Sequence, residues 1–108
     1  MLRVALLVVF AFFSAPAIAG AVPEYTLTIR DHHFVPAELA IPANTKVKLI
    51  VVNQDATAEE FESYELNREK VVAGNTSIIV WVGPLKPGRY PYFGDFHADI
   101  AKGALIVR

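Results

Sequence analysis

Asp95 and His97 lie two residues apart in a polar loop near the C-terminus, and they are the clearest candidates for chemistry. In an extended segment, side chains at positions i and i+2 point to the same side. A carboxylate oxygen and an imidazole nitrogen can then converge on one metal ion. Each residue also has a plainer interpretation. Asp95, like Asp99, suits turn-forming hydrogen bonds, and His97 suits a buried ring bonded to a backbone carbonyl or an exposed ring.

Further oxygen ligands are available in an acidic segment, which carries Glu59, Glu60, Glu62, Glu65 and Glu69. We expect Glu59 to be solvated and Glu60 to cap a short helix. Glu69 beside Lys70 has the alternative of a surface ion pair, which carries little energy. Two or three carboxylates with one imidazole form a hard to intermediate ligand set. Such a set suits Fe(III), Cu(II) or Mn(II) better than Cu(I).

His32 and His33 are adjacent, and adjacent residues on a strand point to opposite faces of the sheet. They cannot easily serve one site together. We expect His33, beside Phe34-x-Pro36, to be the better additional ligand and His32 to be exposed.

The composition excludes several kinds of site. The chain has no cysteine, and its single methionine is Met1, so no thiolate centre can form. No serine lies in a nucleophile-elbow context, and there is no glycine-rich phosphate loop or basic stripe with interleaved aromatics. The net charge of −1 gives no reason to expect nucleic acid or an anionic membrane surface as a partner.

The N-terminus is typical of a cleavable signal peptide over residues 1–19. A short positive start at Arg3 precedes an apolar run over residues 4–13, and Ala17-Ile18-Ala19 fits a small-x-small cleavage site. Cleavage after Ala21 is the second choice. A retained anchor helix is the alternative, but the run is shorter than the ~20 apolar residues that a membrane span needs. We therefore expect an exported domain over residues 20–108.

Alternating apolar and polar residues predict the strands that must position these side chains. Turn residues such as Pro87-Gly88 separate the strands at a spacing typical of a β-sandwich. The capping-box pattern from Thr57 to Glu60 predicts one short helix, ending near Ser63. The expected strands cover residues 25–30, 39–41, 47–53, 78–82, 89–93 and 104–108.

Several motifs resemble a known family. Phe34-x-Pro36, residues 39–43 and Pro87-Gly88-x-Tyr90 look like the cupredoxin pattern. Glu60-Phe61-Glu62-Ser63 and Gly94-Asp95-Phe96-His97 resemble, more specifically, the EfeO-type cupredoxin-like domains. Those are small periplasmic proteins or domains found with bacterial iron-uptake permeases. The resemblance covers essentially all of residues 20–108 and implies a Greek-key, all-β cupredoxin-like sandwich.

The resemblance also implies a site and a role. In cupredoxin topology the acidic segment approaches the loop of Asp95 and His97, where a blue-copper protein would offer cysteine, histidine and methionine. We therefore expect Cu(II) or Fe(III) as the bound ion, with Glu62, Glu69, Asp95 and His97 as ligands. Where the family would place a histidine after Phe-Glu-Ser, this chain has Tyr64. The implied role is periplasmic handling of iron for an inner-membrane permease or another periplasmic component of the same system.

Two alternatives remain beside this interpretation. In the first alternative, the sandwich is a metal-free module that docks to a transport partner. In the second, the protein is an accessory enzyme whose bound metal oxidises Fe(II). A blue-copper electron carrier is excluded, because its copper–thiolate bond needs a cysteine.

Overall fold

A computed structural model describes residues 20–108, which form nine strands and one turn of 3-10 helix, η1. The predicted signal peptide of residues 1–19 lies outside the described residues. Within residues 20–108, no helix has the length and apolar character required to cross a membrane. The elements are β1 (Glu24–Arg30), β2 (His33–Val35), β3 (Glu38–Ile41), β4 (Val47–Asn53), β5 (Glu59–Ser63), β6 (Arg68–Val72), β7 (Ser77–Val82), β8 (Gly88–Gly94), η1 (Asp95–His97) and β9 (Lys102–Val107).

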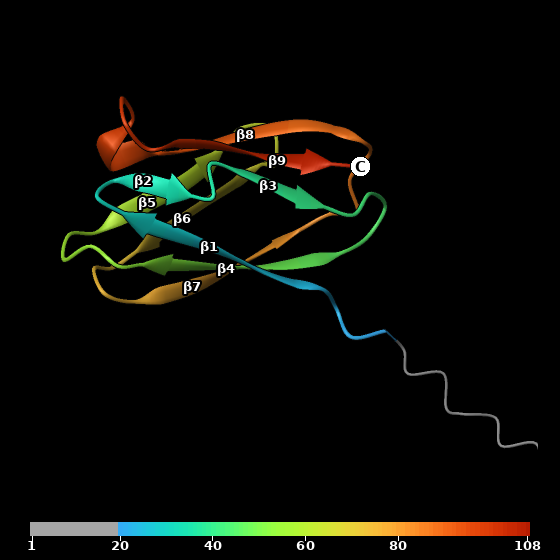
Figure 1. Cartoon of the computed structure of the whole chain (residues 1–108), viewed down its shortest axis with the longest axis horizontal. Helices are drawn as coiled ribbons and strands as arrows, with labels where there is room; N and C mark the ends of the chain where they lie inside the picture. The colour runs from blue at the N-terminus through green and yellow to red at the C-terminus, as the bar shows by residue number, and fades with distance from the viewer. Residues whose placement is uncertain (1–19) are drawn as a thin grey trace, which may run out of the picture.

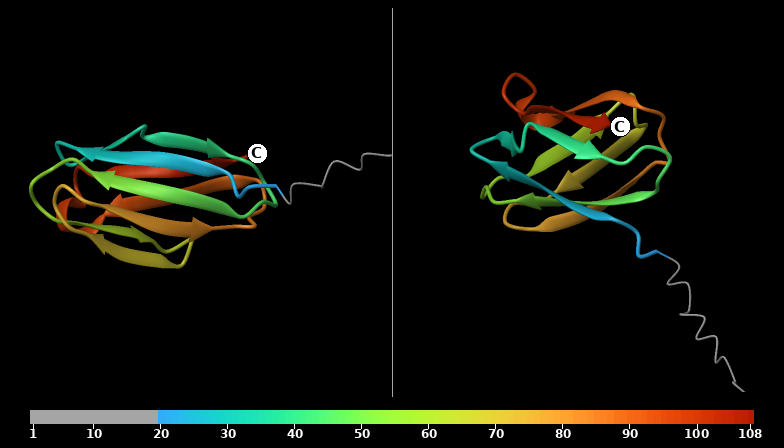
Figure 2. Two further views of the ribbon diagram at one scale, coloured as in Figure 1. Left: turned by 90° about the horizontal axis from the view of Figure 1, so that it is seen from below. Right: turned by 45° about the vertical axis from the view of Figure 1, so that its right-hand side comes forward.

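The strands form two sheets packed face to face, and the predicted all-β sandwich is confirmed (Figures 1 and 2). One sheet has the order β2-β1-β4-β7 and the other the order β3-β9-β8-β5-β6. The pairs β1–β4 and β3–β9 are parallel, and the other pairs are antiparallel. The crossing connections place residues distant in sequence side by side, which the site below requires.

The core fills from alternate residues of each strand. In β4, Val47, Leu49 and Val51 are fully buried, whereas the residues between them face outward and are partly exposed. Within the core, Phe34, Phe61 and Tyr92 form an aromatic cluster. The ring centroids of Phe34 and Tyr92 lie 4.9 Å apart, and those of Phe61 and Tyr92 lie 5.1 Å apart. Phe61 links this cluster to the strand and the face from which Glu59 projects.

The predicted helix is wrong, because residues Glu59–Ser63 form strand β5. Their burial alternates strictly, with Glu59, Phe61 and Ser63 buried and Glu60 and Glu62 facing outward. Strand β5 is paired on both sides, to β6 and to β8. Ladder hydrogen bonds to two neighbours outweigh a local capping-box preference. The backbone of Glu60 is therefore part of a sheet and not of a helix cap.

Three of the connections at one end of the sandwich, on the left in Figure 1, carry the residues of the site and its supports. They are the β1–β2 turn, the segment between β4 and β5, and the loop from β8 to β9 that contains η1. The third connection carries Asp95 and His97. This end therefore gathers polar side chains from three separate parts of the chain.

Candidate metal centre

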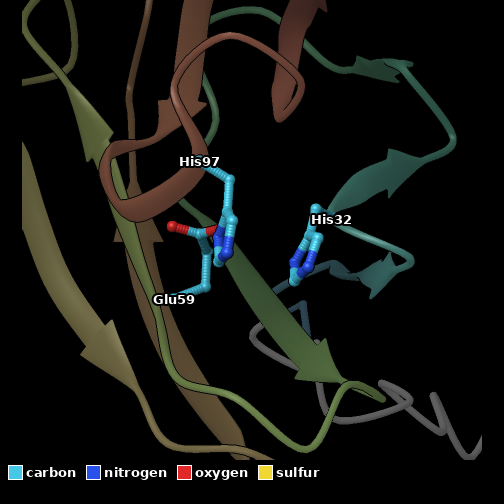
Figure 3. A group of neighbouring side chains, drawn as sticks. All are labelled: His32, Glu59 and His97. Carbon is cyan, nitrogen blue, oxygen red and sulfur yellow. The ribbon is translucent and has the colours of Figure 1, made fainter.

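His32, Glu59 and His97 converge at this end of the sandwich (Figure 3). His32 comes from the β1–β2 turn, Glu59 is the first residue of β5, and His97 is the last residue of η1. One potential ligand atom from each residue lies within 4.8 Å of the ligand atoms of the other two. Two imidazoles and one carboxylate form a set that binds transition metals.

Glu59 is the buried centre of this group, with a side chain only 2% exposed. Its Oε1 accepts hydrogen bonds from the backbone N–H groups of Glu60 (3.0 Å) and Phe96 (2.9 Å). Its Oε2 lies 2.6 Å from Nδ1 of His97. Glu59 faces inward because it is in phase with Phe61 along β5. The expectation that Glu59 is solvated is wrong.

Gly94 leaves the space that the Glu59 carboxylate occupies. A Cβ atom at position 94 would lie 2.5 Å from Cδ of Glu59 and 2.7 Å from Cβ of Ala101. The loop after Gly94 is closed by backbone hydrogen bonds from Gly94 N to Ala101 O (2.9 Å) and from Ala101 N to His97 O (2.8 Å). These contacts fix the backbone of His97 against the first residue of β5.

His32 is held differently, in a two-residue turn. Asp31 and His32 have φ angles of 50° and 62°, and both backbone N–H groups donate to the carboxylate of Asp55. Nδ1 of His32 lies 3.4 Å from Oδ2 of the same carboxylate. The pKa of Asp55 is lowered, chiefly by the hydrogen bond from the His32 backbone, although partial burial opposes the shift. The side chain of His32 is 35% exposed and packs on His97, so the expected free exposure is only partly correct.

The two imidazole rings are stacked. Their centroids lie 3.6 Å apart and their planes differ by 14°, as the parallel rings in Figure 3 show. Ligand lone pairs lie in the ring plane, so two stacked rings cannot both point at one ion about 2 Å away. A shared ion requires one ring to turn. His32 is the ring that can turn more easily, because its Nδ1 lies 3.4 Å from the Asp55 carboxylate, whereas Nδ1 of His97 lies only 2.6 Å from Oε2 of the buried Glu59.

A second group of potential ligand atoms lies at the outer face of strand β5, on the side opposite to Glu59. Carboxylate oxygens of Glu60, Glu62 and Asp95 lie within 4.8 Å of one another. Glu69 lies directly opposite Glu62 in the β5–β6 register. The crowding raises the pKa of Glu60 to about 7, mainly through a hydrogen bond between the carboxyl groups of Glu60 and Glu69. This outer face therefore concentrates negative charge.

The structure thus divides the predicted ligand set into two groups. Glu62, Glu69 and Asp95 lie with Glu60 on the outer face, and these four residues are called the outer group. His97 lies with His32 and Glu59, and these three residues are called the inner group. The strand alternation of β5 separates them, because successive side chains point to opposite sides of the sheet. The assignment of these four residues to one ion stays a prediction.

Sequence reasoning missed His32 and Glu59 as members of a site. A signal for Glu59 existed in its two-residue spacing from Phe61, an apolar residue that must face the core. His33, preferred over His32, is exposed, and its Nδ1 lies 2.8 Å from the backbone carbonyl of Asp31. It lies outside both groups. Tyr64 is also exposed, and its ring packs against Phe93.

Comparison with known proteins gives a consistent family. A sequence model described as the cupredoxin-like domain matches residues 3–107. An uncharacterized protein of Rickettsia prowazekii is 52% identical over 84 residues, which cover 78% of this chain and 67% of that protein. The match to the family model extends through the strands and loops that build both groups of ligand atoms.

Solved structures share the fold at low sequence identity. Auracyanin A, a "blue" copper protein from Chloroflexus aurantiacus, is 15% identical with a TM-score of 0.68, covering 82% of this chain and 100% of its own. The metal-binding domain of the Streptococcus pneumoniae Cu(I)-exporting ATPase CopA is 11% identical with a TM-score of 0.67, covering 79% and 84%. A purple cupredoxin from Nitrosopumilus maritimus is 18% identical with a TM-score of 0.60, covering 77% and 98%. At these identities the likeness is one of fold. The chain belongs to the cupredoxin-like domain family.

Proposed function

We propose that this protein is an exported, metal-binding cupredoxin-like domain that handles iron for an inner-membrane permease or another periplasmic component of the same system. The carrying observation is the convergence of His32, the buried Glu59 and His97 at the loop end of the sandwich. The predicted signal peptide and the resemblance of the Gly94–His97 segment to the EfeO-type domains support the cellular role.

Metal binding explains the residues of the inner group better than a purely structural role does. Glu59 anchors the loop through Phe96 N and Nδ1 of His97, and this anchoring does not require a second imidazole. His32 adds a second imidazole within reach, and this ring has a carboxylate of its own. Two imidazoles make the set softer than the predicted one. Among divalent ions it favours Cu(II), which binds nitrogen and oxygen ligands most tightly in the first transition row.

The outer group suits Fe(III), the alternative to Cu(II) in the prediction. Glu60, Glu62, Glu69 and Asp95 provide oxygen atoms only, and their crowding is what raises the pKa of Glu60. A highly charged cation relieves that repulsion, and hard carboxylates suit ferric iron. In this proposal copper is held by the inner group and iron by the outer one. The iron would then lie on an exposed face of the protein. Its transfer to a partner would need no opening of the core.

Equilibrium dialysis against Cu(II), Fe(III) and Mn(II) tests the binding. We expect one Cu(II) per chain, with the affinity reduced by roughly 10-fold or more in His97→Ala and unchanged in His33→Ala, a histidine outside both groups. Glu62→Gln combined with Asp95→Asn should reduce Fe(III) binding and leave Cu(II) binding intact. The role in uptake is tested in cells that lack the protein. The wild type and His33→Ala should restore iron accumulation, whereas His97→Ala and the variant that combines Glu62→Gln with Asp95→Asn should not. Cu(II) binding that survives His97→Ala would contradict the inner site.

A metal-free docking module is the second candidate. Phe96 and Ile100, both next to the site on the β8–β9 loop, are 50% and 47% exposed. Exposed apolar side chains of this kind suit contact with another protein. Failure of all three ions to bind at stoichiometric levels, together with loss of uptake in Phe96→Ser, would favour this candidate over the first.

A further inference from the structure

We propose that Asp55 is a positioning residue of the inner metal centre: it holds the β1–β2 turn so that His32 lies over His97. The proposal rests on the proposed function for its metal-binding consequence. Oδ1 of Asp55 accepts a hydrogen bond from Asp31 N (2.8 Å), and Oδ2 accepts one from His32 N (3.0 Å). One carboxylate therefore fixes both residues of the turn that carries the second imidazole.

The turn needs this support because of its backbone conformation. Asp31 and His32 both have positive φ, as in a type I′ hairpin turn, for which asparagine and glycine are preferred. Aspartate and histidine tolerate the left-handed region better than most residues, but they still pay a steric cost there. Two hydrogen bonds to a mostly buried carboxylate offset it. Without Asp55, the turn loses these two hydrogen bonds and its positive-φ conformation is less stable.

Asp55 is itself fixed to the core. Its backbone N–H donates to Oδ1 of Asn53 (3.0 Å), and its carbonyl accepts a hydrogen bond from Asn75 N (2.9 Å). Asn53 is buried, and its Nδ2 donates to the carbonyl of Thr57 (2.9 Å). A chain of contacts thus runs from buried Asn53 through Asp55 to His32.

As a consequence, each of the two histidines has a carboxylate oxygen beside its Nδ1. Nδ1 of His97 faces Oε2 of Glu59 at 2.6 Å, and Nδ1 of His32 faces Oδ2 of Asp55 at 3.4 Å. A carboxylate against one ring nitrogen orients the ring and leaves the other nitrogen for a metal. Asp55 therefore decides whether the centre offers one imidazole or two. His32 has only to turn about its side-chain bonds, because the turn keeps its backbone within reach.

The test compares Asp55→Ala and Asp55→Asn with Asp99→Ala, an exposed aspartate of the β8–β9 loop outside both groups. Two signals report on His32. NMR of the protein without added metal measures the nuclear Overhauser effects between the rings of His32 and His97. Electron paramagnetic resonance of the protein with Cu(II) counts the nitrogen ligands. Thermal melts verify that each variant is folded.

In Asp55→Ala we expect the ring-to-ring signals to vanish and the Cu(II) spectrum to change from two nitrogens to one. The Cu(II) affinity should fall about 10- to 100-fold, the range found for groups that orient metal ligands. His32→Ala should show the same loss, and the double variant should show no more. Asp55→Asn keeps one acceptor oxygen, so its Cu(II) affinity should lie between those of the wild type and Asp55→Ala. Asp99→Ala should have the affinity of the wild type. Adding Asp31→Gly, which favours the turn, should restore part of the loss.

Two results would overturn the proposal: ring-to-ring signals that persist in Asp55→Ala, or a two-nitrogen spectrum with unchanged affinity. If Asp55→Ala does not fold, unchanged ring signals in Asp55→Asn have the same meaning. If the wild type binds no Cu(II), the proposed function fails, but the ring signals of the metal-free variants still decide whether Asp55 positions His32.

Discussion

Nδ1 of His97 lies 2.6 Å from Oε2 of Glu59, although the two residues are 38 positions apart in the sequence. This contact joins the first residue of β5 to the last residue of η1, and it does so below the surface. It fixes the β8–β9 loop to the sheet and presents one imidazole at the rim. Binding chemistry and loop stability are therefore coupled at one carboxylate.

Glu59→Ala should destabilise the fold by about 2 kcal/mol, because the backbone N–H groups of Glu60 and Phe96 lose their acceptor. Both bonds are only partly buried, so each unpaired donor should cost about 1 kcal/mol, the lower end of the usual range. Glu59→Gln keeps an acceptor oxygen and should lose less. Urea denaturation measures both. The control is Glu38→Ala, which breaks an exposed 2.8 Å ion pair with Arg89 and should cost under about 1 kcal/mol. Equal losses at positions 38 and 59 would contradict the structural role of Glu59.

Much of the fold was predictable from local pattern. Alternation along Val47–Asn53 and Ser77–Val82 indicated strands, and both form. The region of Glu59 was not predicted correctly, since a capping-box pattern and a two-residue period coexist there. Only the pairing of β5 with both β6 and β8 decides between them. That pairing depends on residues distant in sequence, so a local interpretation could not recover it.

The inner group of the site was hidden for a related reason. The alternation rule placed His32 and His33 on one regular strand, but the chain turns at Asp31 and His32 with positive φ. Asp31 is common at the first position of such a turn, but His32 stands where glycine usually follows. The carboxylate that supports the turn, Asp55, is more than twenty positions away. His97 was recognised because its loop carries a family-like motif, whereas its partners carry none.

Gly94→Ala should destabilise the protein by about 1–3 kcal/mol, the usual cost of overpacking. The added Cβ would meet Cδ of Glu59 at 2.5 Å and Cβ of Ala101 at 2.7 Å, so the carboxylate or the loop must shift. Gly20→Ala is the matched control, because a Cβ there has no neighbour within 4 Å. Thermal melts of both variants test this, and equal midpoints would show that the space beside Gly94 is not tight.

Tyr92→Phe should stabilise the protein by about 1 kcal/mol. The Tyr92 hydroxyl is buried without a hydrogen-bond partner, and burial raises the pKa of this phenol. Removing an unpaired buried hydroxyl recovers its desolvation cost. Tyr90→Phe provides the opposite case, because the Tyr90 hydroxyl donates to the carbonyl of Lys86 at 2.8 Å. It should lose about 0.5–1.5 kcal/mol. Urea denaturation that gives the same sign for both variants would contradict this account.

The outer carboxylates should make stability fall as pH rises toward neutrality. The pKa of Glu60 is raised from its ordinary 4.5 to about 7, chiefly by the hydrogen bond with Glu69. The folded protein therefore binds a proton that the unfolded chain has released. The stabilisation is complete below pH 4.5 and is lost as pH rises through about 7. Melting temperatures at pH 5 and pH 8 should therefore differ less in Glu60→Gln than in the wild type. Glu65→Gln, an exposed glutamate outside both groups, should retain the wild-type difference. If Glu60→Gln shows the full wild-type change, another group is responsible and the crowding at Glu60 has no effect on folding.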